Sequence, residues 1–255
     1  MYAVITGASS GFGTEFARQF AKRGYDLCVV ARRENKLIEL KNELEKAHGI
    51  KVDVCPLDLS DPSGPKKLHD FTAGKEVDVL VNNSGVATAG MPGHTDLDAE
   101  MKMLDVNVRA MHALMRLYLD DMLKRNSGRI LNVSSLSAWL PVPALAAYSA
   151  GKAYILNLSE AVNYELSTMD TKVRVSVVTP GFLNTGIAGD SMTMRDTGRS
   201  VPSFVAKVTE KFLAGKSVIV LGEDKKVSVV RRLLSRKAGE GLLMKAVSQV
   251  LHPKA

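Results

Sequence analysis

The sequence predicts an α/β fold in which a parallel sheet is wound with helices on both of its faces. Short apolar runs alternate with longer helix-patterned segments from one end of the chain to the other, and the runs are rich in Val, Ile and Leu at successive positions. Successive apolar residues indicate strands that are buried on both faces, as a parallel sheet between two helix layers requires. No Pro/Ser-rich linker interrupts this alternation, so we expect a single domain over residues 1–255.

The predicted strands are the apolar runs, and the predicted helices are the segments between them. The strands are Ala3–Thr6, Asp26–Ala31, Val52–Leu57, Val77–Val81, Arg129–Val133, Val173–Val178 and Ser217–Leu221. The helices are Gly13–Arg23, Glu34–His48, Ser63–Thr72, Asp98–Lys124 and Ala147–Thr168. Each helical segment is long enough to connect two parallel strands, which together predicts a doubly wound sheet.

Two stretches depart from this alternation. Residues 182–203 carry Gly, Ser, Thr and Met without clear periodicity directly after a strand, which is typical of a lid over a site. Residues 225–251 are basic and amphipathic, and we expect a C-terminal helix or helix pair there. This extension is expected to pack against a subunit or to be solvated, with contact to an anionic membrane surface as the alternative.

Composition excludes several classes of protein. The net charge is +7, but the basic residues are mixed with acidic ones and aromatic residues make up only 5%, which argues against a nucleic-acid partner. Cys28 and Cys55 lie in apolar runs and are expected to be reduced core residues without metal. The chain starts directly in a predicted strand, and no apolar stretch approaches the roughly 20 residues that span a bilayer. We therefore expect a cytoplasmic protein that is not integral to a membrane.

A glycine-rich loop follows the first predicted strand and precedes the first predicted helix. Its glycines are Gly7, Gly11 and Gly13, and Ser9, Ser10 and Phe12 stand between them. Glycine lets the backbone turn tightly and approach a pyrophosphate, while the helix that follows directs its free N–H groups at the phosphates. The position of the loop predicts a dinucleotide site, although the glycine spacing is not the usual G-x-G-x-x-G.

The end of the second strand indicates which dinucleotide is bound. An acidic residue there holds the 2′-hydroxyl of NAD, but this chain has Ala31 followed by Arg32 and Arg33. Guanidinium groups match a phosphate in bidentate geometry, so we expect NADP(H), with NAD(H) less favoured. The alternative is a pair of surface arginines.

Further candidate cofactor residues stand at the ends of later strands. Asp58, beside Leu59, is placed to accept from an adenine amino group or to cap the next helix. Asn82, in Asn82-Asn83-Ser84-Gly85, is placed to bind ribose or to brace the loop. Pro180-Gly181 and Thr185 are placed to form a wall for nicotinamide and to bond its amide, although Pro-Gly alone indicates only a turn.

Three residues form a candidate catalytic group. Tyr148 and Lys152 are four apart and share one face of a helix, and Ser135 ends the fifth strand, where ligands bind in doubly wound sheets. A phenol is a poor acid–base at neutral pH unless its phenolate is stabilised, which a nearby ammonium does. We assign Tyr148 as the proton donor or acceptor, Lys152 as the group that lowers its pKa and holds ribose hydroxyls, and Ser135 as a donor to the substrate oxygen.

Asn107 lies on the apolar stripe of its predicted helix. A buried amide must find partners, so Asn107 is either a structural brace or the residue that positions a water linking Lys152 to solvent.

Together these residues resemble the classical short-chain dehydrogenase/reductase family. The matching motifs run in order over residues 3–185, including the glycine loop at 6–13, whose spacing is that of the family, and Ser135 thirteen positions before Tyr148. The resemblance implies a Rossmann-type, seven-stranded, three-layer α/β/α fold. It also implies a catalytic tetrad of Asn107, Ser135, Tyr148 and Lys152.

Three features depart from the family pattern. Ser84 replaces the usual alanine, and Ser10 stands where many NADP-using members carry a basic residue. The C-terminus continues beyond the seventh strand, so we expect a homodimer at least as readily as the tetramer common in the family.

The resulting prediction is an NADP(H)-dependent oxidoreductase that interconverts a ketone and a secondary alcohol. Met192 and Met194, near Phe182, Ile187 and Phe204, indicate a bulky apolar carbonyl such as a 3-oxoacyl chain or a steroid, although methionines also serve as plain packing. The alternative is a catalytically silent NADP-binding sensor or scaffold.

Overall fold

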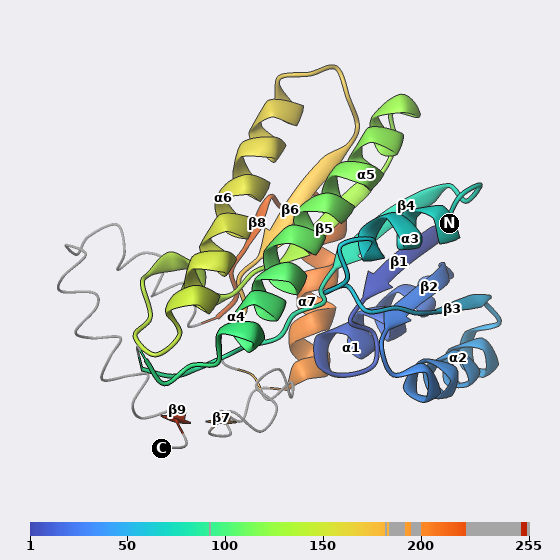
Figure 1. The fold of residues 1–255 in the computed structure, drawn as a ribbon. Coiled ribbons are helices and arrows are strands. Elements are labelled where there is room, and N and C mark those ends of the chain that lie inside the picture. Colours follow the sequence, from blue (N-terminus) through green and yellow to red (C-terminus); the bar gives the residue numbers. More distant parts are fainter. Residues whose placement is uncertain (92, 182, 184–191, 195–199, 223–250, 254–255) are drawn as a thin grey trace.

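The protein is described by a computed structural model that covers residues 1–91, 93–181, 183, 192–194, 200–222 and 251–253. Its centre is a seven-stranded sheet in the order β3-β2-β1-β4-β5-β6-β8, in which all neighbouring strands are parallel (Figure 1). The strands are β1 (Tyr2–Thr6), β2 (Asp26–Ala31), β3 (Val52–Pro56), β4 (Val77–Asn82), β5 (Arg129–Val133), β6 (Arg174–Val178) and β8 (Val218–Ile219). The predicted doubly wound fold is thus confirmed.

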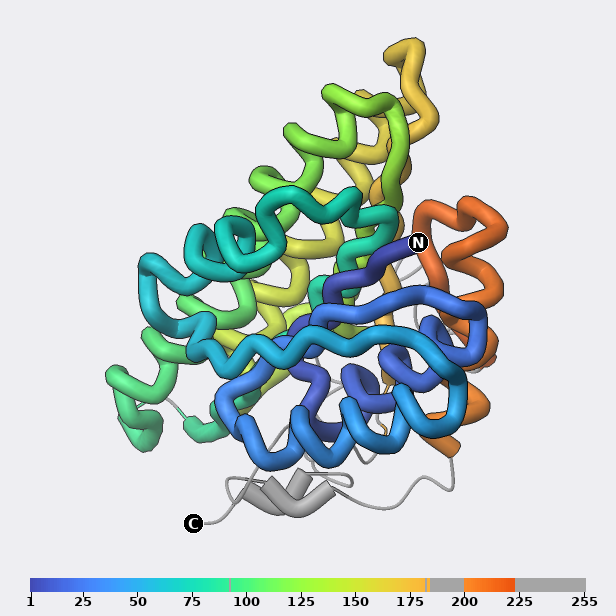
Figure 2. Tube along the Cα trace, turned by 90° about the vertical axis from the view of Figure 1, so that its right-hand side faces the viewer, coloured from blue at the N-terminus to red at the C-terminus, as the bar shows by residue number. Residues whose placement is uncertain are grey.

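Helices cover both faces of this sheet. They are α1 (Gly11–Ala21), α2 (Glu34–His48), α3 (Gly64–Phe71), α4 (Leu97–Leu104), the π-helical turn η1 (Asp105–Ala110), α5 (Met111–Lys124), the 3-10 turn η2 (Leu136–Trp139), α6 (Ala146–Ser167) and α7 (Val201–Leu213). In the turned view, α7 (orange) lies on the opposite side of the molecule from α4 and α5 (green) (Figure 2).

Two apolar cores, one on each face, hold the layers together. On β1, Ala3 and Ile5 pack with buried residues of α1, α2 and α7, whereas Val4 packs with those of α3, α5 and α6. Neighbouring strand residues therefore serve opposite cores, because side chains alternate across a strand. This arrangement explains why the strands are apolar at successive positions.

Two predicted elements differ from the structure. The segment predicted as one helix over Asp98–Lys124 is divided by the π-helical turn η1, and helix α7 begins at Val201, inside the segment predicted as a lid. The apolar residues of α7 (Phe204, Val205, Val208 and Phe212) recur at helical spacing and join the core shared with α1 and α2, so this helix completes the layer.

The remaining lid and tail predictions fall largely outside the described residues. A second, two-stranded antiparallel sheet joins β7 (Met192–Met194) to β9 (Leu251–Pro253), so Leu251 lies in a strand and not at the end of a helix. Residues 182, 184–191, 195–199 and 223–250 are not described. None of the helices in the described ranges has the length and apolar character that a transmembrane span needs.

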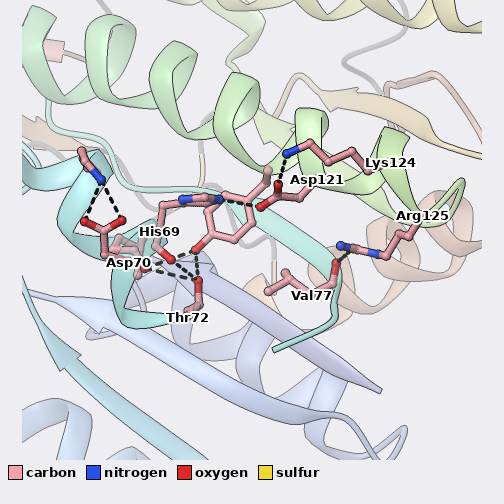
Figure 3. A network of polar contacts seen from close by, with 10 residues as sticks. His69, Asp70, Thr72, Val77, Asp121, Lys124 and Arg125 are labelled. Carbon is pink, nitrogen blue, oxygen red and sulfur yellow. Dashed lines mark hydrogen bonds and ion pairs between the residues drawn. The ribbon is translucent and has the colours of Figure 1, made fainter. Parts of the chain in front are cut away.

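A polar network fastens α3 to α5 at the end of the sheet where the strands begin (Figure 3). His69 Nε2 lies 2.7 Å from Asp121 Oδ2, and the hydroxyls of Thr72 and Tyr118 lie 2.7 Å apart. Arg125, just after α5, donates to the carbonyl of Val77 at the start of β4. The network therefore lies at the amino-terminal ends of the strands, and the loops that follow the strands lie at the opposite, carboxyl ends.

Candidate active site

The glycine-rich loop makes the tight turn that its sequence predicts. Gly7 and Gly11 have φ values of 70° and 55°, which favour glycine. A Cβ at Gly13 would lie 2.1 Å from the carbonyl oxygen of Gly7, so the first turn of α1 packs directly against the loop. Thr14 Oγ1 donates to the carbonyl of Ala8 at 2.8 Å and closes the turn.

A cavity of about 410 Å³ opens in front of this loop. This volume falls in the range typical of cofactor and ligand pockets. Its lining contains Gly7, Ser9, Ser10, Gly11, Phe12, Arg32, Arg33, Asp58 and Leu59, all predicted from sequence. It also contains Ala31, Leu57, Ser60, Asn83, Ser84, Gly85, Val86, Lys102 and Val106.

The two arginines after β2 are arranged differently. Arg33 Nη2 lies 3.0 Å from Ser9 Oγ and 3.2 Å from the Ser9 carbonyl, so this guanidinium is already held against the glycine-rich loop. Arg32 is exposed and lines the same cavity. The cavity therefore has two cations at the end of β2, and the acidic side chain that would hold a 2′-hydroxyl is not there.

Asp58 serves the turn after β3 as well as the cavity. Its Oδ1 accepts from the backbone N–H and the hydroxyl of Ser60, both at 2.9 Å. Asp58 therefore closes a turn and does not cap the next helix, since α3 begins at Gly64 with Ser63 before it. Asp58 also lines the cavity, in keeping with the adenine alternative.

The asparagines after β4 brace the fold. Asn82 is buried and donates from Nδ2 to the Met111 carbonyl at 2.7 Å, and it is not part of the cavity lining. Asn83 lines the cavity and donates from Nδ2 to the Thr6 carbonyl at 2.9 Å. In the structure Asn82 thus braces the fold, and its neighbour Asn83 lines the cavity.

Ser135 and Tyr148 meet, as predicted, beyond the end of β5. Ser135 follows β5 directly, and Tyr148 lies in the first turn of α6. Burial raises the pKa of Tyr148 to about 12, while a hydrogen bond with Ser135 opposes that rise.

Lys152 lies one turn further along α6, with its Nζ 5.7 Å from the centroid of the Tyr148 ring. Nζ donates to the carbonyl of Val133 at 3.0 Å, and burial lowers the pKa of this amine to about 8. The role predicted for Lys152, to lower the pKa of the phenol, stays a prediction. The ammonium lies over the ring and bonds to β5, so Ser135 is the group that opposes the effect of burial on Tyr148.

Asn107 is buried within the π-helical turn η1. Its Nδ2 donates to the Val86 carbonyl at 2.8 Å, and its Oδ1 accepts from the Val86 N–H at 3.0 Å. Both atoms of the side-chain amide are thus used to fix the loop after β4, as the bracing alternative expects.

Gly85 connects this cluster to the cavity. It is part of the cavity lining, and a Cβ built on it would lie 3.4 Å from Asn107 Oδ1 and 3.5 Å from Lys152 Nζ. Asn107 and Lys152 are not part of the cavity lining themselves, but their side chains end beside Gly85, which is.

The other predicted residues are not part of the cavity lining, and one of them lies outside the described ranges. Gly13 packs behind the loop, and the Pro180 carbonyl accepts from the Leu136 N–H at 2.7 Å, which ties the end of β6 to η2. Gly181 follows it, and Thr185 is not among the described residues. Phe204, predicted to lie near the substrate, stacks on Phe12 with ring centroids 5.5 Å apart.

Sequence reasoning missed several residues of the site. Lys102 and Val106 are four apart on the helix that carries Asn107, so the sequence shows that they share a face, but not that this face meets the cavity. Ser134 is not among the residues predicted from the sequence, yet its Oγ donates to the Lys152 carbonyl at 2.7 Å. The side chains of two adjacent serines cannot be told apart by composition.

The loop and cavity fit a dinucleotide. A side chain at Gly7 or Gly13 would collide with backbone or with Asn83, so glycine at these positions lets the loop pack tightly against the start of α1. Backbone N–H groups at the start of such a helix are where a dinucleotide pyrophosphate binds. Arg32 and Arg33 supply positive charge at the adenosine end.

Comparison with known proteins identifies the family. The family model described as short chain dehydrogenase matches residues 1–196, so this chain belongs to the short-chain dehydrogenase family of oxidoreductases, which use nicotinamide cofactors.

Curated relatives and solved structures agree with this membership. The chain is 33% identical over 192 residues to a very-long-chain 3-oxoacyl-CoA reductase of Rattus norvegicus, covering 73% of this chain and 61% of that protein, less than two thirds of its length. It is 30% identical over 186 residues to a 7beta-hydroxysteroid dehydrogenase of Clostridium sardiniense, covering 71% of each chain.

Among solved structures, a short-chain dehydrogenase from Sphingobium yanoikuyae in complex with NADPH superposes with a TM-score of 0.79 at 26% identity, covering 100% of this chain and 98% of that one. A relative from Burkholderia phymatum in complex with NAD superposes with a TM-score of 0.78 at 26% identity, covering 91% of this chain and 92% of that one. Structural neighbours thus bind either nicotinamide cofactor.

Proposed function

We propose that the protein is an NADP(H)-dependent oxidoreductase that interconverts a bulky, apolar ketone and the corresponding secondary alcohol. The observation that carries this proposal is the hydrogen bond between Ser135 and Tyr148, with Lys152 Nζ 5.7 Å from the phenol ring and next to the cavity wall at Gly85. The dinucleotide would supply or accept the hydride.

The residues of this chain divide the remaining chemistry. Reduction of a ketone leaves an alkoxide that must receive a proton, and Tyr148 is the donor. Ser135 donates a hydrogen bond to the substrate oxygen and stabilises the charge that develops there. Lys152 supplies positive charge within a dry site, where an ionic interaction is stronger than in water.

The cofactor preference rests on the end of β2. Arg32 and Arg33 both line the cavity, and the contact of Arg33 with Ser9 reduces the ordering that phosphate binding would require. We infer NADP(H), with NAD(H) as the alternative.

The substrate class is inferred from the relatives and the local surface. The names of the two curated relatives indicate two candidate substrate classes, 3-oxoacyl thioesters and steroids. Beside Tyr148, Val142, Leu145 and Met103 form a buried apolar cluster, in keeping with an apolar substrate. The expected homodimer and cytoplasmic location stay predictions.

The proposed function is tested with NADPH oxidation over a panel of 3-oxoacyl thioesters, steroid ketones and small aldehydes. We expect turnover of one of the apolar classes, and a loss of kcat of at least about 100-fold in Tyr148→Phe, because a positioned acid–base contributes about 10² to 10⁴. Tyr154→Phe is the matched control, since this exposed tyrosine on the same helix contacts His112 away from the site.

Two results would contradict the proposal. Turnover that survives in Tyr148→Phe would remove the assigned proton donor. NADPH binding without turnover across the panel would favour the silent sensor or scaffold.

A further inference from the structure

We propose that Ser134 is a positioning residue that locks one turn of α6 onto the end of β5 and so determines where the ammonium of Lys152 lies beside Tyr148. The inference rests on the proposed function, because it assigns Ser134 a role in the same chemistry. Within the part of the chain that the structure describes, Ser134 does not line the cavity, and the hydrogen bond of its hydroxyl goes to the Lys152 carbonyl and not to Tyr148.

Three consecutive residues at the end of β5 contact α6. The carbonyl of Val133 accepts from Lys152 Nζ at 3.0 Å, the hydroxyl of Ser134 donates to the Lys152 carbonyl at 2.7 Å, and Ser135 hydrogen-bonds Tyr148. Lys152 is therefore held at both ends, by its ammonium and by its own backbone.

The contact from Ser134 is not needed to satisfy a buried carbonyl. Lys152 lies inside the long helix α6, where its carbonyl is also the acceptor for the N–H four residues later. The backbone N–H of Ser134 donates to the Val178 carbonyl at 2.8 Å, which continues the ladder between β5 and β6 and fixes Ser134 to the sheet. The Ser134 hydroxyl thus links a residue held by the sheet to a helical turn whose backbone hydrogen bonds are already formed. Its contribution is to dock α6 against the end of β5.

This docking matters because the residues that position the ammonium are buried, and small displacements there change how it interacts with Tyr148. Ser134 and Lys152 are 3% and 1% exposed, so solvent does not screen the ammonium. Val133 and Ser134 both contact Lys152, and Ser135 contacts Tyr148 one turn earlier on α6, so a shift of this part of the helix would move Tyr148 and Lys152 together. Displacements of about 1 Å are known to lower catalytic rates by up to about 100-fold.

The test compares two deletions of one hydroxyl at the same interface. Ser134→Ala removes the contact to the Lys152 carbonyl. Ser159→Ala is the control, because Ser159 is equally buried on α6, accepts from Asn132 Nδ2 on β5 at 2.9 Å and donates to the Ile155 carbonyl at 2.7 Å, two turns away from Lys152.

We expect Ser134→Ala to lower kcat about tenfold while KM for NADPH and for the ketone stays within about twofold, since Ser134 binds neither. Ser159→Ala should lower Tm to a similar degree and leave kcat within about twofold. Equal losses of kcat in the two variants, or a wild-type kcat in Ser134→Ala, would overturn the inference.

Hydrogen exchange over residues 148–156 tests the docking without any turnover. Exchange there should rise in Ser134→Ala and not in Ser159→Ala, and unchanged protection in Ser134→Ala would also overturn the inference. A failure of the proposed function is seen separately, as wild-type turnover that is absent or does not depend on Tyr148.

Discussion

At the scale of single residues, burial drives Tyr148 and Lys152 toward their neutral forms. It raises the pKa of the phenol to about 12 and lowers the pKa of the amine to about 8. At neutral pH the phenol therefore keeps its proton, which suits donation to a reduced carbonyl. Release of that proton, as alcohol oxidation requires, needs the phenolate to be stabilised, and Ser135 is the neighbour that favours it in this structure.

The two arginines after β2 give the first prediction at this scale. Arg32→Ala and Arg33→Ala should each weaken NADPH binding about 10- to 100-fold, the range for a hydrogen bond to a charged group, and change NADH binding little. The loss should be larger for Arg33, because Ser9 already orients its guanidinium. Fluorescence titration of both cofactors measures the two affinities.

Lys36→Ala controls for the general loss of positive charge near this site, because Lys36 is an exposed residue of α2 paired with Glu39. A parallel loss of NADPH and NADH affinity in the arginine variants would show that they bind some shared part of the cofactor and not a 2′-phosphate.

At the scale of elements, the π-helical turn η1 is the feature that places Asn107. The extra residue of a π-helical turn rotates the helix relative to a regular α-helix, and such turns are often found at functional sites. Asn107 reaches Val86 from this turn, and Asn82 donates to the carbonyl of Met111 where α5 begins. The end of β4 and the loop after it are thus fastened to η1 and to the start of α5.

These elements show where prediction from the sequence succeeds and where it stops. The strands before the cavity were predicted because Ala3, Val4 and Ile5 are buried on alternating faces, a pattern that sequence displays directly. The turn η1 was missed because a single π-helical turn leaves the apolar periodicity of a long helix nearly unchanged. Which atoms of Asn107 are engaged depends on a loop twenty residues away, and spacing alone cannot predict that contact.

The network between α3 and α5 gives a prediction at the scale of elements (Figure 3). Burial, the largest single effect, raises the pKa of Asp121, but hydrogen bonds with His69 and Lys124 outweigh it and hold this pKa below its ordinary value. A lowered carboxylate pKa contributes stability above the pKa of the unfolded chain, about 4, and that stability is lost as the pH falls through the folded value.

Asp121→Asn should therefore lower the free energy of unfolding at pH 7 by about 0.5 to 1 kcal/mol, a modest value because the side chain is partly exposed. The difference from wild type should shrink below about pH 4. Asp120→Asn, which breaks an exposed pair with Arg116 on the same helix, is the control and should cost less. Urea unfolding at both pH values measures this, and a pH-independent difference would refute the electrostatic account.

At the scale of the whole molecule, the cavity exists only when the sheet is assembled. Its walls come from the loops after β1, β2, β3 and β4 and from the helix before Asn107, segments that lie up to about a hundred residues apart in the chain. Because the strands are parallel, these loops all lie at the carboxyl ends of the strands, where ligands of doubly wound sheets bind. An unfolded chain presents no such surface, so cofactor binding must be coupled to the stability of the fold.

A ligand that binds only the folded state at 100 times its Kd stabilises it by about 2.7 kcal/mol. For a chain of this size each kcal/mol raises Tm by roughly 2 to 4 °C, so NADPH at that concentration should raise Tm by about 5 to 10 °C. At equal concentration NADH should raise it less, and adenosine 2′,5′-bisphosphate should raise it more than AMP, because Arg32 and Arg33 line the adenosine end of the cavity. Scanning calorimetry with the four ligands separates the alternatives. Equal shifts with NADPH and NADH would refute the 2′-phosphate assignment, and no shift with any ligand would mean that this cavity is not the dinucleotide site.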